Sequence, residues 1–202
     1  MYYELYNPTS ELVERLPLSQ WNGKQQTVLT TNSIVPDFSL LPSQVIKKGT
    51  TNETTIYSAE VWHNRPLVIS FFCPCWGEYG TQHLQYLKQL YPQIKQAGGE
   101  LWVISNQTSE VVRRLSTYKT LPFTLIADPS YHIARQFGVY SDTAPLWQLV
   151  SGVSENAYTP GVFVIDTKGR IQFSQVDKYL ENTFSANHII KAVWESKPLA
   201  FD

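Results

Sequence analysis

The stretch LVISFFCPCWGEYGTQHLQYLKQL, residues 67–90, decides the fold. Its first six residues, LVISFF, have the length and composition of a strand that is buried on both faces. From about residue 78 leucines recur at helical spacing between polar residues, at Leu84, Leu87 and Leu90. A buried strand therefore leads through a short turn into a helix. In an open α/β sheet the carboxyl end of a strand usually carries the chemistry, and a helix N-terminus favours a negative charge such as a thiolate.

The rest of the chain repeats this alternation of strands and helices. Strands are predicted at residues 101–105, 121–126, 161–166 and 171–176, and helices at residues 109–118, 131–137 and 186–194. The order of strand, helix and strand around residues 67–105 predicts a right-handed parallel crossover. Shorter patterns predict a capped helix at residues 10–16 and strands at residues 25–29 and 54–62. We interpret residues 1–33 as an N-terminal arm that packs on a domain of residues 34–197.

Length and composition narrow the class of protein. A chain of 202 residues suits one domain with a full hydrophobic core. Sixteen basic and seventeen acidic residues leave a net charge of -1, so no basic field attracts nucleic acid. No apolar run has the roughly 20 residues that cross a bilayer, and the N-terminus does not look like a secretory signal. Two cysteines one residue apart are no disulfide framework, and we expect a cytosolic, reducing location.

Several motifs together indicate a family. They are the aromatic pair Phe71-Phe72 followed by Trp76, the segment IVPDFSL at residues 34–40, LPFTLIADPSYHIARQFGVY at residues 121–140, and TPGVFVID at residues 159–166. Over residues 34–195 the chain resembles the peroxiredoxin-like branch of the alkyl hydroperoxide reductase/thiol-specific antioxidant family. The resemblance implies a thioredoxin-like three-layer α/β sandwich, with a mixed central sheet flanked by helices. It also implies thiol oxidoreductase activity without a cofactor, on a peroxide or on a thiol or disulfide protein, and leaves a homo-oligomer open.

The cysteines of this chain do not occupy the positions that the resemblance implies. The family's Trp-Cys-x-x-Cys segment aligns with WGEYG, so its cysteines fall on Gly77 and Gly80. The other peroxiredoxin pattern, Pro-x-x-x-Thr-x-x-Cys, places Glu78 and Thr81 at its last two defined positions when it starts at Pro74. The family's peroxide-binding arginine is also missing from residues 159–161. We therefore expect weak or altered peroxide reduction, and we expect the scaffold to accept cysteines at the two glycines.

Cys73 and Cys75 are the remaining candidate redox pair, with Cys75 reacting and Cys73 resolving. The alternative is that Cys73 ends the strand as a small buried apolar residue. A zinc site would recruit His83, but these three ligands are one fewer than a closed site needs, so no metal is expected. The loop around the pair comprises Trp76, Gly77, Glu78, Tyr79, Gly80 and Thr81.

The resemblance further implies a cis-proline that faces the cysteine loop. We predict a cis Thr159–Pro160 bond close to residues 75–80, because prolines are disfavoured inside sheets and cis bonds occur almost only before proline. Two functions stay open: a thiol oxidoreductase, and a catalytically degenerate module that binds a peptide beside Thr159–Pro160. Thioredoxin folds bind extended peptides there through backbone pairing, which needs no cysteine.

Overall fold

The computed structural model describes residues 27–47, 54–150, 152–153 and 157–197, together with the backbone of two strands near the N-terminus. These strands, β1 (Tyr2–Tyr6) and β2 (Leu12–Pro17), pair with each other in an antiparallel hairpin. Within the described residues no helix is long and apolar enough to cross a membrane.

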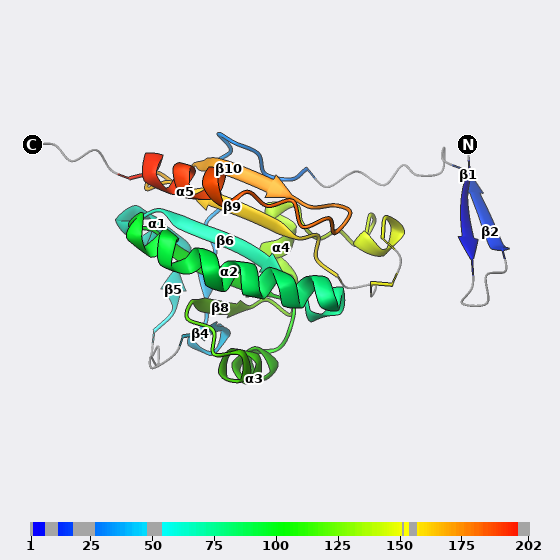
Figure 1. Ribbon diagram of the computed structural model, residues 1–202, viewed down its shortest axis with the longest axis horizontal. Helices are drawn as coiled ribbons and strands as arrows, with labels where there is room; N and C mark the ends of the chain where they lie inside the picture. The colour runs from blue at the N-terminus through cyan, green and yellow to red at the C-terminus, as the bar shows by residue number, and fades with distance from the viewer. Residues whose placement is uncertain are drawn as a thin grey trace, which may run out of the picture.

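A six-stranded mixed sheet forms the centre of the molecule (Figure 1), in the order β10-β9-β6-β7-β8-β4. Three central strands run parallel: β6 (Leu67–Phe72), β7 (Glu100–Ser105) and β8 (Thr124–Ala127). The three outer strands are antiparallel to their inner neighbours: β9 (Gly161–Ile165), β10 (Ile171–Val176) and β4 (Val45–Ile46). A separate two-stranded sheet pairs β3 (Ser39–Leu40) with β5 (Ile56–Tyr57).

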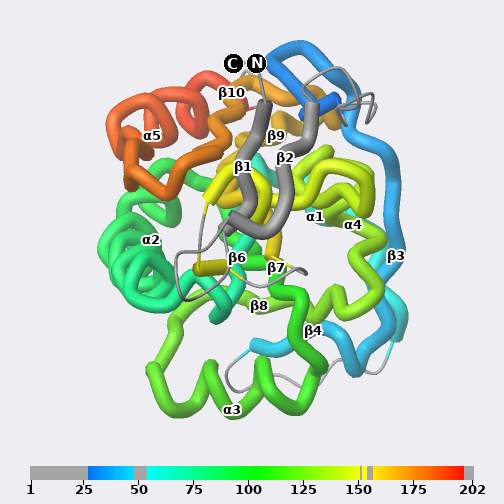
Figure 2. The backbone as a smooth tube through the Cα atoms, turned by 90° about the vertical axis from the view of Figure 1, so that its right-hand side faces the viewer, coloured from blue at the N-terminus to red at the C-terminus, as the bar shows by residue number. Residues whose placement is uncertain are grey.

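Helices cover both faces of the sheet (Figure 2). The helices α2 (Glu78–Gln96) and α5 (Ala186–Glu195) lie together on one side, and α4 (His132–Phe137) lies on the other. Two further helices complete the fold: α1 (Ser58–Asn64) follows β5, and α3 (Ser109–Lys119) packs against β8 and β4. The three-layer sandwich and the mixed sheet predicted from the sequence are confirmed.

Alternate residues of β6 face different layers, as the period of two in a strand requires. The hydroxyl of Ser70 points to α2, where it lies 2.9 Å from Nε2 of His83. The neighbouring Phe71 points the other way, and its ring centroid lies 5.4 Å from that of Phe137 on α4. All six residues of β6 are buried, which explains why this strand reads as an unbroken apolar run.

Three of the less regular segments differ from the expectations. The helix predicted at residues 10–16 is wrong, because Leu12–Pro17 forms a strand whose pairing with β1 outweighs a weak local helix preference. The strand predicted at residues 54–62 is also wrong, since only Ile56–Tyr57 is extended before α1 begins. Helical spacing there buries Ser58 and Trp62, four residues apart, on one face. Of the strand predicted at residues 25–29, residues 27–29 are not in a strand and the others lie outside the described residues.

Candidate functional site

The two cysteines lie at the carboxyl end of the central strand. Cys73 directly follows β6, and Pro74–Trp76 form a single 3₁₀ turn that leads to α2. Cys73 is fully buried, whereas Cys75 is partly exposed. The candidate pair therefore consists of one cysteine inside the protein and one that is partly exposed to solvent.

The sulfurs of Cys73 and Cys75 are joined in a disulfide. Two N–H donors point at the buried sulfur: the backbone nitrogen of Cys75 lies 3.2 Å from Cys73 Sγ, and Nδ2 of Asn106 lies 3.4 Å from it. The sequence analysis missed Asn106. The available signal was its place directly after β7, the strand that runs parallel beside β6.

The glycines at the two family positions lie where side chains fit badly. Gly77 joins the 3₁₀ turn to α2 with φ 59° and ψ -123°, a conformation that residues with a Cβ rarely adopt. Gly80 is buried in the first turn of α2, where an added Cβ would lie 3.1 Å from the carbonyl oxygen of Cys73. The backbone conformation of Gly77 thus speaks against the expectation that the scaffold accepts cysteines at both positions, and a side chain at Gly80 would require its neighbours Cys73 and Phe72 to shift by a few tenths of an ångström.

Other residues of the predicted loop divide into exposed and structural ones. Glu78 and Thr81 are exposed at the start of α2, and the Glu78 carboxylate accepts a hydrogen bond from Gln82. The Tyr79 hydroxyl donates to Asp177 Oδ2 over 2.8 Å, so this ring joins α2 to the segment after β10. Burial, and secondly the hydrogen bond to Asp177, raise the pKa of Tyr79 well above its usual range. Tyr79 therefore remains neutral and acts as a hydrogen-bond donor.

Trp76 connects the cysteine turn to the segment before β9. Its indole is almost completely buried, and Nε1 donates to the carbonyl oxygen of Tyr158 over 2.9 Å. The indole also packs edge-on against Phe72 and Tyr79, with ring centroids 5.9 Å and 5.6 Å away. These contacts fix the turn that carries Cys75.

His83 lies behind the loop as part of the core. It is fully buried, bonds to Ser70, and packs against the rings of Trp76, Tyr79, Tyr86 and Phe184. Burial lowers the pKa of His83 to about 4, against a smaller opposite effect of the Asp177 charge. The imidazole is thus neutral at pH 7. Within the described residues no group of three histidine, cysteine or acidic side chains has the arrangement of a metal site.

The predicted cis bond before Pro160 is wrong, because the described part of the chain has only trans peptide bonds. Pro160 precedes the first residue of β9, where a missing N–H costs no ladder hydrogen bond and no special conformation is required. The Thr159 N–H already donates to the Val139 carbonyl over 2.7 Å, and the Pro160 carbonyl accepts from Asp177 N over 2.9 Å. This segment contacts the cysteine turn by the hydrogen bond from the Trp76 indole to the Tyr158 carbonyl.

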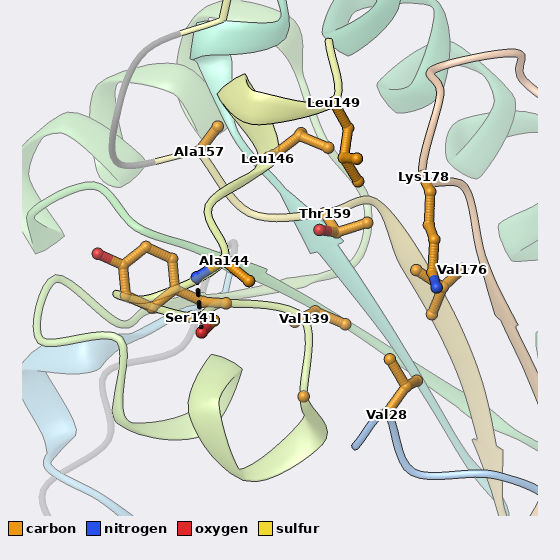
Figure 3. A pocket seen from close by; sticks show the side chains of 12 residues that line it. Val28, Val139, Ser141, Ala144, Leu146, Leu149, Ala157, Thr159, Val176 and Lys178 are labelled. Atoms are coloured by element: carbon orange, nitrogen blue, oxygen red, sulfur yellow. Dashed lines mark hydrogen bonds between the residues drawn. The ribbon is translucent and has the colours of Figure 1, made fainter. Parts of the chain in front are cut away.

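A pocket of about 100 Å³ opens next to Thr159 (Figure 3). Apolar side chains from several segments make up most of its wall, among them Val28, Val139, Leu146, Leu149 and Val176. Among the described residues that line it, Lys178 is the only one with a cationic side chain. The structure thus has a small apolar pocket beside residues 157–159, the segment whose Tyr158 carbonyl accepts the hydrogen bond from Trp76.

Known proteins similar to this chain support a family assignment. The model of the "AhpC/TSA family" matches residues 31–174, which is most of the chain. The peroxiredoxin Bcp of Escherichia coli K12 is 27% identical over 86 residues, 43% of this chain. That match spans only about half, 52%, of the length of the Escherichia coli protein.

Two solved structures share the fold of this chain at low sequence identity. The peroxidoxin BcpB of Mycobacterium tuberculosis superposes with a TM-score of 0.60 at 19% identity, covering 82% of this chain and 94% of that one. The AhpC of Enterococcus faecalis superposes with a TM-score of 0.64 at 16% identity, covering 84% and 93% of the two chains. The structural likeness establishes the thioredoxin-like fold, and the sequence match over residues 31–174 establishes that this chain belongs to the AhpC/TSA family.

Proposed function

We propose that this chain is a thiol–disulfide oxidoreductase whose redox pair is Cys73 and Cys75. The observation that carries the proposal is a disulfide at the carboxyl end of the central strand, between one fully buried and one partly exposed cysteine. Because Cys73 is fully buried, an external thiolate would attack at the partly exposed Cys75, and two N–H groups point at the sulfur that would leave. This asymmetry assigns different roles to the two cysteines.

Reduction of the pair begins when an external thiolate attacks Sγ of Cys75. The Cys73–Cys75 bond breaks, its electron pair stays on Cys73, and a mixed disulfide forms at Cys75. A second external thiolate then releases Cys75, so that two thiols become one disulfide and the pair becomes a dithiol. In the opposite direction the dithiol reduces a disulfide of a partner protein. The cycle needs no cofactor, and a reducing cytosol supplies the thiols.

A peroxide is the second substrate class, and we expect it to react slowly. The Cys75 thiolate would attack one peroxide oxygen to give a sulfenic acid and water or an alcohol, after which Cys73 would displace water and restore the disulfide. Cys75 lies in the 3₁₀ turn rather than in the first turn of α2, and residues 159–161 carry no arginine. The peroxide would therefore meet few groups that stabilise the departing oxygen.

The test combines intact mass with two kinetic assays. Mild reduction should add two hydrogens to the mass, and the reduced protein should reduce a disulfide substrate such as insulin. With hydrogen peroxide it should return to the oxidised mass far more slowly than an ordinary peroxiredoxin. Cys75→Ser should abolish both reactions, whereas Cys73→Ser should accumulate mixed disulfides at Cys75. A pair that never changes mass under physiological thiol concentrations would contradict the proposal.

The alternative function is binding without redox chemistry. A peptide could not pair with a backbone N–H at Thr159–Pro160, because the Thr159 N–H already donates to the Val139 carbonyl and proline has no N–H. A binding function would therefore depend on the pocket beside Thr159. A partner captured equally well by the wild type and by the Cys73→Ala/Cys75→Ala variant would favour this alternative.

A further inference from the structure

The buried sulfur of the disulfide lies beside an amide that comes from the neighbouring strand. Phe72 and Ser105 are register partners in the parallel pair β6 and β7, so the next residues, Cys73 and Asn106, leave the sheet side by side. The Asn106 Nδ2 atom lies 3.4 Å from Cys73 Sγ. Two adjacent parallel strands therefore bring the amide to the sulfur.

The orientation of this amide is fixed by a second contact. Gln107 Nε2 donates to Asn106 Oδ1 over 3.0 Å, which leaves the NH₂ end of Asn106 facing the sulfur. The backbone N–H of Gln107 in turn lies 3.4 Å from Ser105 Oγ, at the end of β7. The donor is thus in position before any reaction takes place.

We propose that Asn106, oriented by Gln107, is a positioning residue that stabilises Cys73 as the leaving thiolate and thereby speeds attack on Cys75. A disulfide sulfur is a weak acceptor, whereas a thiolate is a strong one, so the hydrogen bond gains strength as charge develops. Cys73 is removed from water, and the two N–H groups at 3.2 Å and 3.4 Å take the place of solvent. The inference rests on the proposed redox function.

The first test needs no turnover and stands apart from that function. In a Cys75→Ser background, the pKa of the single Cys73 thiol is read from thiolate absorbance. Asn106→Leu keeps a branched side chain of similar size but removes the donor, and it should raise this pKa by about one unit. Gln107→Ala leaves the donor but releases its orientation, and it should raise the pKa by a smaller amount. Thr108→Ala, at an exposed position of the same loop, is the control and should change nothing.

The second test uses the intact pair and measures exchange. A thiol that ionises less readily leaves more slowly, so Asn106→Leu should slow reduction by dithiothreitol about threefold for each pKa unit. Mixed disulfides trapped with glutathione should lie on Cys75 in both proteins, because Cys73 is fully buried, and they should form more slowly in the variant.

The outcomes separate the two proposals. An unchanged Cys73 pKa in a folded Asn106→Leu variant overturns the role of Asn106, whether or not the protein is a redox enzyme. If that variant does not fold, Gln107→Ala decides alone, and unchanged pKa and exchange rate overturn the inference. A shifted pKa in a protein without any disulfide exchange would refute the proposed function but keep the contact between Asn106 and the thiolate.

Discussion

Gly77 has a conformation that explains its presence at the cysteine turn. With φ 59° and ψ -123°, it turns the chain from the 3₁₀ segment into α2, and a Cβ there would strain the backbone although it would meet no atom of the described residues within 4 Å. We predict that Gly77→Ala lowers the free energy of unfolding by about 1–3 kcal/mol. Urea unfolding measures this loss.

The neighbouring residue provides the control for this substitution. Glu78→Ala removes an exposed side chain in the first turn of α2 and should change stability by no more than about 0.5 kcal/mol. Equal stability of wild type and Gly77→Ala would mean that the turn relaxes, and that the glycine has another origin.

His83 makes stability depend on pH between its pKa in the folded protein and its pKa in the unfolded chain. The pKa of the buried imidazole is lowered to about 4, chiefly by burial, against 6.5 in the unfolded chain. Between these values the unfolded chain binds a proton that the folded chain does not. Stability therefore falls as the pH is lowered from about 6.5 to about 4, by a total of about 3 kcal/mol.

A series of urea unfolding curves between pH 7.5 and pH 4 tests this dependence. His83→Leu should remove most of the pH dependence, at a cost in stability because Ser70 loses its partner. His63→Leu, at an exposed position of α1, should leave the pH dependence as it is. The same pH dependence in both variants would show that other groups are responsible.

Individual residues differed in how well the sequence predicted them. The cysteine pair could be predicted, because the chain has only two cysteines and both follow the most apolar strand. For Asn106 the only signal was its place directly after the next predicted strand, since its contact depends on the register of β6 with β7, which is a property of the folded sheet. The cis-proline was inferred from the family motif and from the cost of a proline inside a sheet, but Pro160 lies just before β9, and the Thr159 N–H is hydrogen-bonded with a trans bond.

The hydrogen bond from Trp76 joins the cysteine turn to the segment that enters β9. Trp76→Phe keeps an aromatic ring but leaves the buried carbonyl of Tyr158 without its donor, which should cost about 1–3 kcal/mol. Trp194→Phe is the matched control, because that indole is 54% exposed on α5. Urea unfolding of the two variants compares the costs, and equal losses would contradict the role of the hydrogen bond.

The central elements followed from the sequence because their patterns are long and regular. The strand at residues 67–72, the helix from residue 78 and the later alternation all appear near the predicted positions. The wrong assignments concern short amphipathic segments, at residues 10–16 and 54–62. There, pairing with another strand or burial of Trp62 decides between helix and strand, and neither is visible in a local pattern.

The folded molecule should tolerate both redox states, because the disulfide closes only a three-residue loop. The chain-entropy argument gives such a small loop about 1.5 kcal/mol of stabilisation. For a protein of 202 residues, reduction should therefore lower the melting temperature by about 5 °C or less. Calorimetry with and without a phosphine reductant measures the shift.

A variant without the pair separates this effect from damage by the reductant. Cys73→Ser/Cys75→Ser should melt at the same temperature with and without reductant, close to the reduced wild type. Unfolding of the wild type on reduction would instead mark the disulfide as a structural bond, and a redox cycle would then be excluded.

The register between β6 and β7 also has a consequence for protein engineering. Because Cys73 and Asn106 each follow a register-paired residue, the site depends on two short loops above adjacent parallel strands. A graft into another thioredoxin-like scaffold therefore has two parts, a Cys-Pro-Cys turn after the central strand and an Asn-Gln pair after its parallel neighbour. With the turn alone, the disulfide of the recipient protein should exchange slowly with thiols. Adding the second loop should make this exchange fast without any change to the helices.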